Sequence, residues 1–244
     1  MKRSSVLGAE IDLVGFDEAI DRAMDAMNGR TGRFVITPNA EFLLKVGARR
    51  ELREASRQAF LSLPDSIGIV CAAKIQGSAS LERIPGIDFA QTLLGKMSEK
   101  GKSVFLFGAK EGVAEKAAER LCRQYPGLVI AGVKSGYFSA EDEEQICRQI
   151  SAASPDLLIV CLGCPKQELW MLRNAPRLSA GLMAGLGGAL DVFAGIARRA
   201  PERWRKAGLE WLYRILIEPK RILRVMRIPF IIPISLWYRI GGKK

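Results

Sequence analysis

The sequence predicts an α/β fold in which a largely parallel sheet is covered by helices on both faces, followed by a basic helical appendage. Two observations carry this prediction. Over the first 200 residues, short apolar runs alternate with segments of helical periodicity, and the runs lack the polar alternation of a strand with one solvated face. The last fifth of the chain instead mixes arginines with apolar and aromatic residues.

The first elements follow in order. The segment 6–15 (VLGAEIDLVG) has the pattern of a strand or short hairpin, and 16–27 has helical spacing with Asp17 as its N-cap. The run 33–36 (RFVI) predicts a short strand that ends at TPNAE, and a helix follows it.

The same alternation continues through the middle of the chain. Residues 109–125 are rich in alanine and predict a helix. Ser139 and Asp142 have capping-box spacing before a further helix that runs to about Ser151. Apolar runs that predict buried strands occupy residues 103–108, 128–133, 156–163 and 181–188. Strands of this kind, separated by helices, are typical of a Rossmann-like sheet.

A change in composition near Pro201 predicts two parts, an α/β domain of residues 1–200 and an appendage of residues 201–244. The net charge of +11 belongs almost wholly to the last fifth of the chain, because the stretch from Ile196 to the C-terminus holds 13 Lys and Arg against three Glu. The appendage has a helical pattern except at Pro219 and ends in an apolar run with two prolines. This surplus predicts an anionic partner at the C-terminal end.

Length and composition exclude several classes of protein. No uninterrupted apolar stretch reaches the roughly 18 residues of a spanning helix, and no apolar signal region follows the basic start. Five cysteines, an odd number, without an export signal predict a reducing compartment and no disulfide framework. We therefore expect a cytoplasmic protein.

Polar residues and glycines gather just after the apolar runs, in the loops TPNAE, LPDSIG, FGAKEG, GCPKQE and GLGGALD. In open α/β sheets the ligand binds outside the carboxyl ends of the strands, which is where these loops would lie. A single Asn or Asp in such a loop is equally typical of a turn or a cap. Their shared position favours a site, with the candidate residues Asn39, Asp65, Gln167 and Asp191 and the glycines Gly108, Gly187 and Gly188.

The pair Cys161 and Cys164 has the Cys-x-x-Cys spacing of a redox or metal site. Cys161 lies within an apolar run and is expected to pack like a small hydrophobic residue. A structural zinc site needs about four ligands, but the chain has no histidine and no second close cysteine pair. We therefore predict that the cysteines are incidental and that no metal is bound.

Other absent residues and motifs exclude several kinds of catalytic or cofactor site. Without histidine, a Ser–His or Cys–His nucleophile cannot form. There is no GxxxxGK[ST] loop, FGAKEG resembles a dinucleotide loop only loosely, and no Asp-x-Asp pair ends a strand. No cofactor is predicted. A phosphorylated leaving group would have to be neutralised by arginine, lysine and helix N-termini.

Six stretches in order, TPNAE, LPD, ERIPGID (82–88), GCPKQELW, RAPERW (199–204) and GLEWLYRILIEPKRILR (208–224), resemble the WecG/TagA/CpsF family of bacterial glycosyltransferases, glycosyltransferase family twenty-six. The resemblance runs from about Val6 to Arg227. The sequence departs from the family pattern at two places, Ser66, where glycine is usual, and the pair Ala189 and Leu190 before Asp191.

The resemblance implies an inverting transfer of an N-acetylmannosamine-type sugar from a UDP donor to undecaprenyl-diphosphate-linked N-acetylglucosamine, without a metal. It implies Asp65 as the base and Thr37, Asn39 and Gln167 as residues that hold the sugars. Arg83 would reach a phosphate or the acceptor, or form a surface ion pair. Further substrate-binding residues would be Lys166, Gly108, Gly187, Gly188 and Asp191. Teichoic acid, enterobacterial-type antigen and capsule pathways all stay open, as does a homo-oligomer.

The appendage has the residues of a membrane-docking segment, because its arginines suit anionic headgroups and its Trp and Tyr suit the interface. We expect peripheral association with the inner face of the cell membrane. The resemblance also implies that Arg214, Arg221 and Arg224 fold over the site as a lid that neutralises the departing UDP. The alternative is simple headgroup binding.

Three other functions compete with this interpretation. A nicotinamide oxidoreductase would need a full GxGxxG and an acidic residue after the next strand, which here offers lysine. A nucleic-acid-binding module would use the basic tail, but the aromatic residues among Ile and Leu suit a membrane better, so no nucleic acid is expected. A non-catalytic membrane-surface adaptor that binds a nucleotide is the main alternative.

Overall fold

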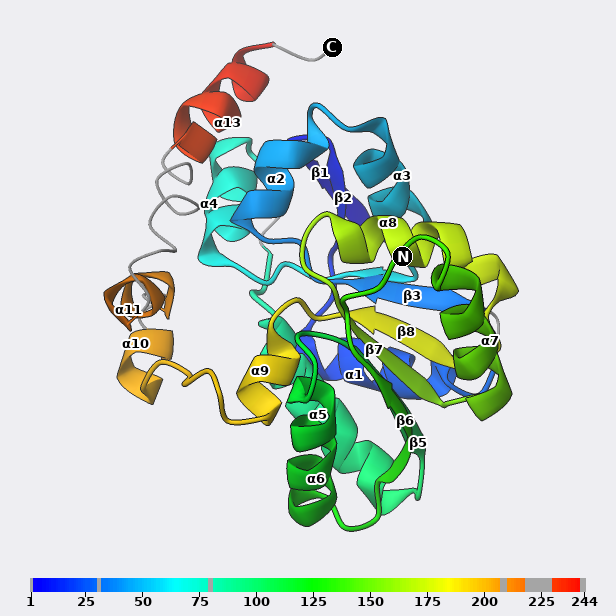
Figure 1. Cartoon of the computed structure of the whole chain (residues 1–244). Coiled ribbons are helices and arrows are strands. Elements are labelled where there is room, and N and C mark those ends of the chain that lie inside the picture. Colours follow the sequence, from blue (N-terminus) through cyan, green and yellow to red (C-terminus); the bar gives the residue numbers. More distant parts are fainter. Residues whose placement is uncertain (1, 30–31, 79–80, 207–209, 218–229, 242–244) are drawn as a thin grey trace.

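The structure, a computed structural model, describes residues 2–29, 32–78, 81–206, 210–217 and 230–241. A six-stranded sheet forms its centre, and each pairing within the sheet is parallel (Figure 1). The strand order is β4-β3-β8-β7-β5-β6. The bounds are β3 Arg33–Ile36, β4 Leu61–Ser62, β5 Ser103–Gly108, β6 Val129–Lys134, β7 Leu157–Cys161 and β8 Leu182–Gly185. The predicted parallel α/β sheet is confirmed.

Successive side chains of the central strands enter two separate cores. In β7, Leu157 and Ile159 pack into one apolar cluster, whereas Leu158 and Val160 pack into the other. Alternate residues of a strand point to opposite faces, so a strand buried on both faces must be apolar throughout. This is why the strands read as uninterrupted apolar runs.

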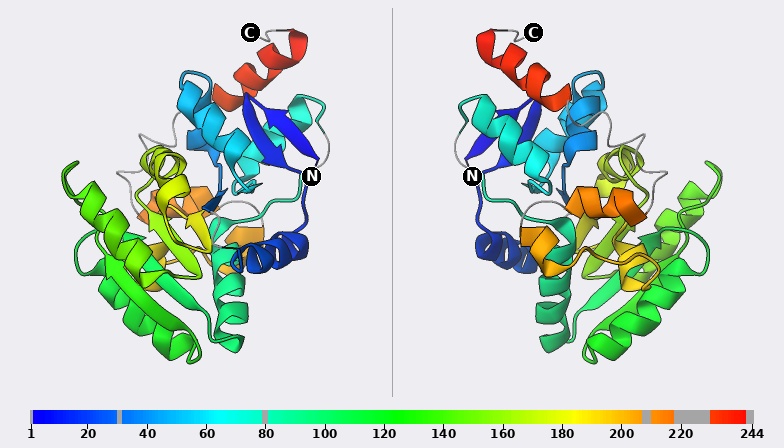
Figure 2. Two further views of the ribbon diagram at one scale, coloured as in Figure 1. Left: turned by 90° about the vertical axis from the view of Figure 1, so that its right-hand side faces the viewer. Right: turned by 90° about the vertical axis from the view of Figure 1, so that its left-hand side faces the viewer.

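Helices cover both faces of the sheet (Figures 1 and 2). The first core receives apolar side chains from α1 Phe16–Ala26, α5 Gly86–Glu99, α6 Val113–Gln124 and α9 Ala189–Phe193. The second receives them from α2 Ala40–Val46, α3 Arg50–Gln58, α4 Ile67–Ile75, α7 Glu143–Ala153 and α8 Lys166–Asn174, which continues into a short 3-10 turn, Ala175–Arg177. The helices cover the faces of the sheet but not the carboxyl ends of its strands, and the loops meet there.

An N-terminal hairpin, β1 Arg3–Val6 and β2 Ala9–Asp12, forms a small antiparallel sheet of its own. The side chain of Asp12 accepts hydrogen bonds from Arg3 Nε at 2.8 Å and from the N–H of Ser62 at 2.7 Å. Ser62 ends β4, so this buried carboxylate fastens the hairpin to the edge of the main sheet. The hairpin expected near residues 6–15 is present, although it begins earlier in the chain.

Two predicted helix caps were wrong. Gly15, not Asp17, precedes α1, and Asp17 lies in its first turn, where an acidic side chain suits the helix dipole. Ser139 and Asp142 do pair, because Asp142 accepts the N–H and the hydroxyl of Ser139 at 2.9 and 2.8 Å. Asp142 is nevertheless the residue before α7, so the predicted capping box lies one turn too early.

The appendage contains α10 Glu202–Lys206, α11 Glu210–Ile217 and α13 Ile231–Ile240. Helix α13 packs against α4 and α2 through the buried residues Ile231 and Ser235 (Figure 1). Its exposed large apolar residues are Ile232, Leu236, Trp237 and Ile240, and the exposed Phe230 directly precedes the helix. Among the described residues, no helix has the length and apolar character to cross a bilayer. The predicted break at Pro219 lies outside the described residues.

Candidate active site

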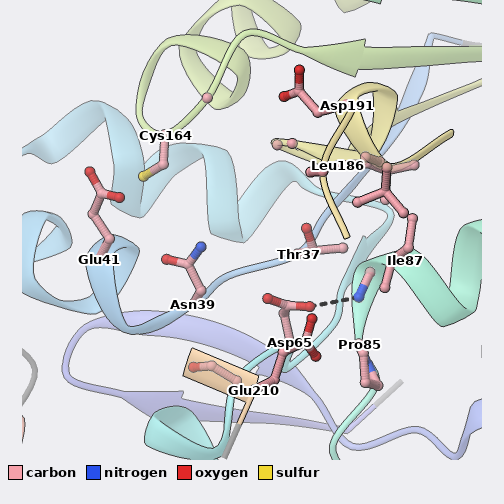
Figure 3. Close-up of a pocket in the computed structure, with 18 of the residues that line it drawn as sticks. Thr37, Asn39, Glu41, Asp65, Pro85, Ile87, Cys164, Leu186, Asp191 and Glu210 are labelled. Atoms are coloured by element: carbon pink, nitrogen blue, oxygen red, sulfur yellow. Dashed lines mark hydrogen bonds between the residues drawn. The ribbon is translucent and has the colours of Figure 1, made fainter. Parts of the chain in front are cut away.

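A pocket of about 330 Å³ opens where the strands β3, β4, β7 and β8 end (Figure 3). Thr37 follows β3, Asp65 follows β4, Gly163 follows β7 and Leu186 follows β8, and all four line the pocket. This is the location that parallel sheets favour for ligands. Of the predicted site residues, those that line it are Thr37, Asn39, Asp65, Arg83, Gln167, Gly187, Gly188 and Asp191.

Asp65 is fixed at the pocket by backbone hydrogen bonds. Its Oδ1 accepts the N–H of Gly86 at 2.6 Å, drawn as a dashed line in Figure 3, and its own N–H donates to the carbonyl of Pro38 at 3.0 Å. Gly86 begins α5, where a free N–H group is left for a carboxylate to bind. The loop after β4 and the start of α5 thereby hold one carboxylate at the pocket.

Thr37 joins the ends of two neighbouring strands. Its hydroxyl donates to the carbonyl of Gly185, the last residue of β8, at 2.8 Å, and the residue is buried. A Cβ on Gly86 would lie 3.2 Å from Thr37 Cγ2, so the glycine lets α5 approach this side chain closely. Thr37 therefore packs between β8 and the residue that binds Asp65.

Asn39 is the N-cap of α2, because its Oδ1 accepts the N–H of Phe42 at 3.1 Å. This is the cap function that the sequence left open as the alternative to a site. Since Asn39 also lines the pocket, both descriptions hold (Figure 3). The capping bond uses the amide oxygen, which fixes the orientation of the side chain at the cavity wall.

Gln167 uses both polar atoms of its side chain on the protein. Its Oε1 accepts the N–H of Gly187 at 3.0 Å, and its Nε2 donates to Glu168 Oε1 at 3.0 Å. Only 3% of Gln167 is exposed. Although Gln167 lines the pocket, these bonds make it a brace for the loop after β8, a role that the resemblance did not imply.

Arg83 lines the pocket and reaches the appendage. Its Nη2 donates to the carbonyl of Arg205 in α10 at 3.2 Å. Two other predicted residues are absent from the pocket lining. Lys166 is exposed at the start of α8, and a Cβ on Gly108 would lie 2.4 Å from the carbonyl oxygen of Cys161, so this glycine allows β5 and β7 to approach. The binding roles proposed for these residues stay predictions.

Several lining residues were not predicted. Among the charged ones, Glu41 forms an ion pair with Lys45 at 2.6 Å, and Arg198 and Glu210 come from the C-terminal fifth of the chain. Glu41 ends the TPNAE loop and Glu210 lies in the GLEW stretch, so both signals were present in the sequence. The described lining thus carries four carboxylates and two guanidinium groups.

The appendage reaches the pocket through Glu210, the first residue of α11. Arg214 lies in the same helix, but its side chain lies outside what the structure describes, as do Arg221 and Arg224 altogether. The predicted contribution of these three arginines is therefore untested by the geometry.

The two cysteines of the Cys-x-x-Cys pair, Cys161 and Cys164, are poor nucleophiles. Burial raises the pKa of the Cys161 thiol to about 12, and it also raises the pKa of Cys164, which lines the pocket. A thiolate is the reactive and metal-binding form of cysteine, so neither group is prepared for those roles. Within the described ranges, no cluster of three or more His, Cys, Asp or Glu could hold a metal ion.

Known proteins resemble the chain over most of its length. A family model described as "Glycosyl transferase WecG/TagA/CpsF family" matches residues 4–244. A protein of Bacillus spizizenii is 36% identical over 198 residues, which cover 81% of this chain and 76% of the relative. One from Bacillus subtilis is 33% identical over 200 residues, 82% and 77%. One from Staphylococcus aureus is 33% identical over 226 residues, 92% and 88%. All three are called N-acetylglucosaminyldiphosphoundecaprenol N-acetyl-beta-D-mannosaminyltransferase.

Proposed function

The chain belongs to the WecG/TagA/CpsF family of glycosyltransferases, and we propose that it transfers N-acetylmannosamine, or a related sugar, from a UDP donor. The acceptor is undecaprenyl-diphosphate-linked N-acetylglucosamine, and the product belongs to a cell-surface polysaccharide of the teichoic acid type. The names of the three relatives support this donor and this acceptor.

The position of Asp65 is the observation that carries the proposal. Its carboxylate lines the pocket beyond the strand ends and is held by the N–H of Gly86 at 2.6 Å. An inverting transfer needs a base that takes the proton of the acceptor hydroxyl as its oxygen attacks the anomeric carbon of the donor. The bond from that carbon to the UDP oxygen breaks in the same step, and UDP leaves with the bonding electrons.

The charge of the pocket supports a second role, for the appendage. The four carboxylates of the described lining, Glu41, Asp65, Asp191 and Glu210, outnumber its two guanidinium groups, Arg83 and Arg198. A departing diphosphate needs positive charge around it. We propose that Arg214, Arg221 and Arg224 supply it when the appendage closes as a lid. The presence of Glu210 from α11 in the pocket lining supports this arrangement.

Membrane association follows from the acceptor, whose lipid chain is confined to a bilayer. The exposed apolar side chains of α13, with Trp237 and Ile240 among them, and the basic surplus of the C-terminal segment support docking on an anionic surface. The protein would then act at the cytoplasmic face of the membrane as a peripheral enzyme.

The experiment incubates the full-length chain with a panel of UDP-sugars and a short-chain lipid diphosphate that carries N-acetylglucosamine, and it measures UDP release. We expect acceptor-dependent release that is fastest with UDP-N-acetylmannosamine or a close analogue. A non-catalytic adaptor would bind UDP, but it would release none from any donor. That result would reject the proposed function.

A further inference from the structure

We infer that Glu168 is a positioning residue, which accepts a hydrogen bond from Gln167 and so fixes the loop after β8 at the pocket. The inference rests on the proposed function only for its effect on turnover. Glu168 lies in the first turn of α8, the helix that packs beside β8 (Figure 1), and 2% of it is exposed. It is not among the residues that line the pocket.

The amide of Gln167 can face the loop in two ways, and only one of them is satisfied. The N–H of Gly187 needs an acceptor, which Gln167 Oε1 provides at 3.0 Å. The Nε2 of the same amide then points away from Gly187 and needs an acceptor of its own. Glu168 Oε1 provides it at 3.0 Å. Reversing the amide would oppose two donors at Gly187.

The packing around Gly185 confines this amide. A Cβ on Gly185 would lie 3.2 Å from Gln167 Nε2 and 2.6 Å from Met171 Cε, so the side chain of Gln167 lies directly over the end of β8. From the end of the neighbouring strand β3, the hydroxyl of Thr37 donates to the carbonyl of the same glycine. The end of β8 is thus held between Thr37 and the pair of Gln167 and Glu168.

Glu168 orients Gln167 as a buried acid, and within the described ranges it has no ionic partner in hydrogen-bonding range. Its second oxygen, Oε2, has no hydrogen-bond partner in the part of the chain that the structure describes. The charged and titratable groups near it are Lys45, Glu41 and Cys164, but Lys45 Nζ already donates to Glu41 Oε1 and to the carbonyl of Cys164. An isolated buried carboxylate is costly, so the neutral acid is the form that fits this place.

The test measures hydrogen exchange of the Gly187 amide in the free protein, without any substrate. In Glu168→Leu, Gln167 loses its orienting partner, and we expect Gly187 to exchange roughly tenfold faster, the order of one lost hydrogen bond. In Glu168→Gln the amide oxygen still accepts from Gln167, so we expect a change of less than about twofold. Glu143→Leu removes one of the two acceptors of Asn174 Nδ2 at the other end of α8 and serves as the control.

Coupling to Gln167 separates positioning from a general loss of packing. In a Gln167→Ala background, Glu168→Leu should not accelerate Gly187 exchange further, because the connecting amide is gone. Unchanged Gly187 exchange in Glu168→Leu would overturn the inference. So would an equal acceleration in Glu168→Gln, which keeps the shape and the acceptor.

Turnover provides the second measurement. We expect Glu168→Leu to lower kcat by about tenfold or more through a misplaced loop, whereas Glu168→Gln keeps kcat within about twofold. Loss of turnover in Glu168→Gln with intact UDP binding would mean that the ionised carboxylate is required, which contradicts positioning by a neutral acid. If the wild type transferred no sugar while the exchange results held, the proposed function would fail and the inference would stand.

Discussion

The guanidinium of Arg199 donates to the carboxylate of Asp88 over 2.5 Å, and Arg205 approaches the same carboxylate oxygen at 3.6 Å. Asp88 lies in the first turn of α5, and only 14% of the Arg199 side chain is exposed. Since Arg83 also binds the carbonyl of Arg205, the start of the appendage is joined to the α/β domain by one carboxylate and one arginine beside the pocket.

Replacing Asp88 with Asn should weaken this attachment of the appendage to the α/β domain. The two arginines lose their shared negative charge, at a cost on the order of 1–3 kcal/mol for hydrogen bonds to a charged group. Trypsin should then cut between Arg203 and Lys206 several-fold faster than in the wild type. As a control, Asp21→Asn removes the exposed ion pair between Asp21 in α1 and Lys96 in α5. This change should leave the cleavage rate unchanged. Equal cleavage rates for Asp88→Asn and the wild type would show that the attachment depends on other contacts.

Truncation after Ala200 distinguishes a lid from an anchor. With a water-soluble, short-chain acceptor no bilayer is needed, so an anchor is dispensable. We expect the truncated chain, and Arg221→Glu alone, to lose transfer even to this acceptor, because the leaving diphosphate lacks its cations. Normal turnover of the truncated chain in solution, with failure only on liposomes, would show that the appendage is an anchor and not a lid.

The stability of Glu168→Gln relative to the wild type should increase as the pH rises. Burial raises the pKa of this carboxyl above its ordinary value of 4.5, so the folded state holds the proton more tightly than the unfolded chain. Wild-type stability is therefore lost as the pH rises above 4.5 and through the raised pKa. The Tm of Glu168→Gln minus that of the wild type should grow between pH 4 and pH 8. The exposed Glu115→Gln controls for the loss of one acid, and a pH-independent difference would contradict the buried-acid description.

Chelation and cysteine removal should leave catalysis intact. Activity in excess EDTA should equal that without it, because the proposed mechanism uses arginines for the leaving group. The double variant Cys161→Ala, Cys164→Ala should retain turnover after a modest loss of stability from the buried Cys161. Abolition of transfer by EDTA, with restoration by a divalent metal, would reverse this expectation.

The sheet could be predicted because a strand that is buried on both faces is apolar at every residue, as β7 is. The helix α5 was not predicted as an element, and the short strand β4 was implied only by the position of the LPDSIG loop after an apolar run. Leu61–Ser62 is too short for a periodic signal, and Gly86, an unfavourable residue for a helix, opens α5 because its N–H binds Asp65. Contacts that are distant in sequence decided these elements.

The site was predictable where position along a strand decides it. Asp65, Asn39 and Thr37 follow strands, and the sheet brings them to one pocket. The inward hydrogen bonds of Gln167 were not predictable, because they depend on where Gly187 and Glu168 lie in space. Glu210 was missed as a lining residue for the same reason, since the path of the appendage is set by distant partners such as Asp88.

The central claim is that the family's glycosyl transfer occurs in this pocket with Asp65 as its base. The most direct measurement compares the wild type with Asp65→Asn, using UDP-N-acetylmannosamine and the short-chain acceptor, with product quantified by mass spectrometry and UDP affinity by calorimetry. Because asparagine keeps the size of the side chain but cannot take the proton, we predict a fall in turnover of roughly 10²-fold or more with little change in UDP affinity. Near-normal turnover of Asp65→Asn would contradict the account.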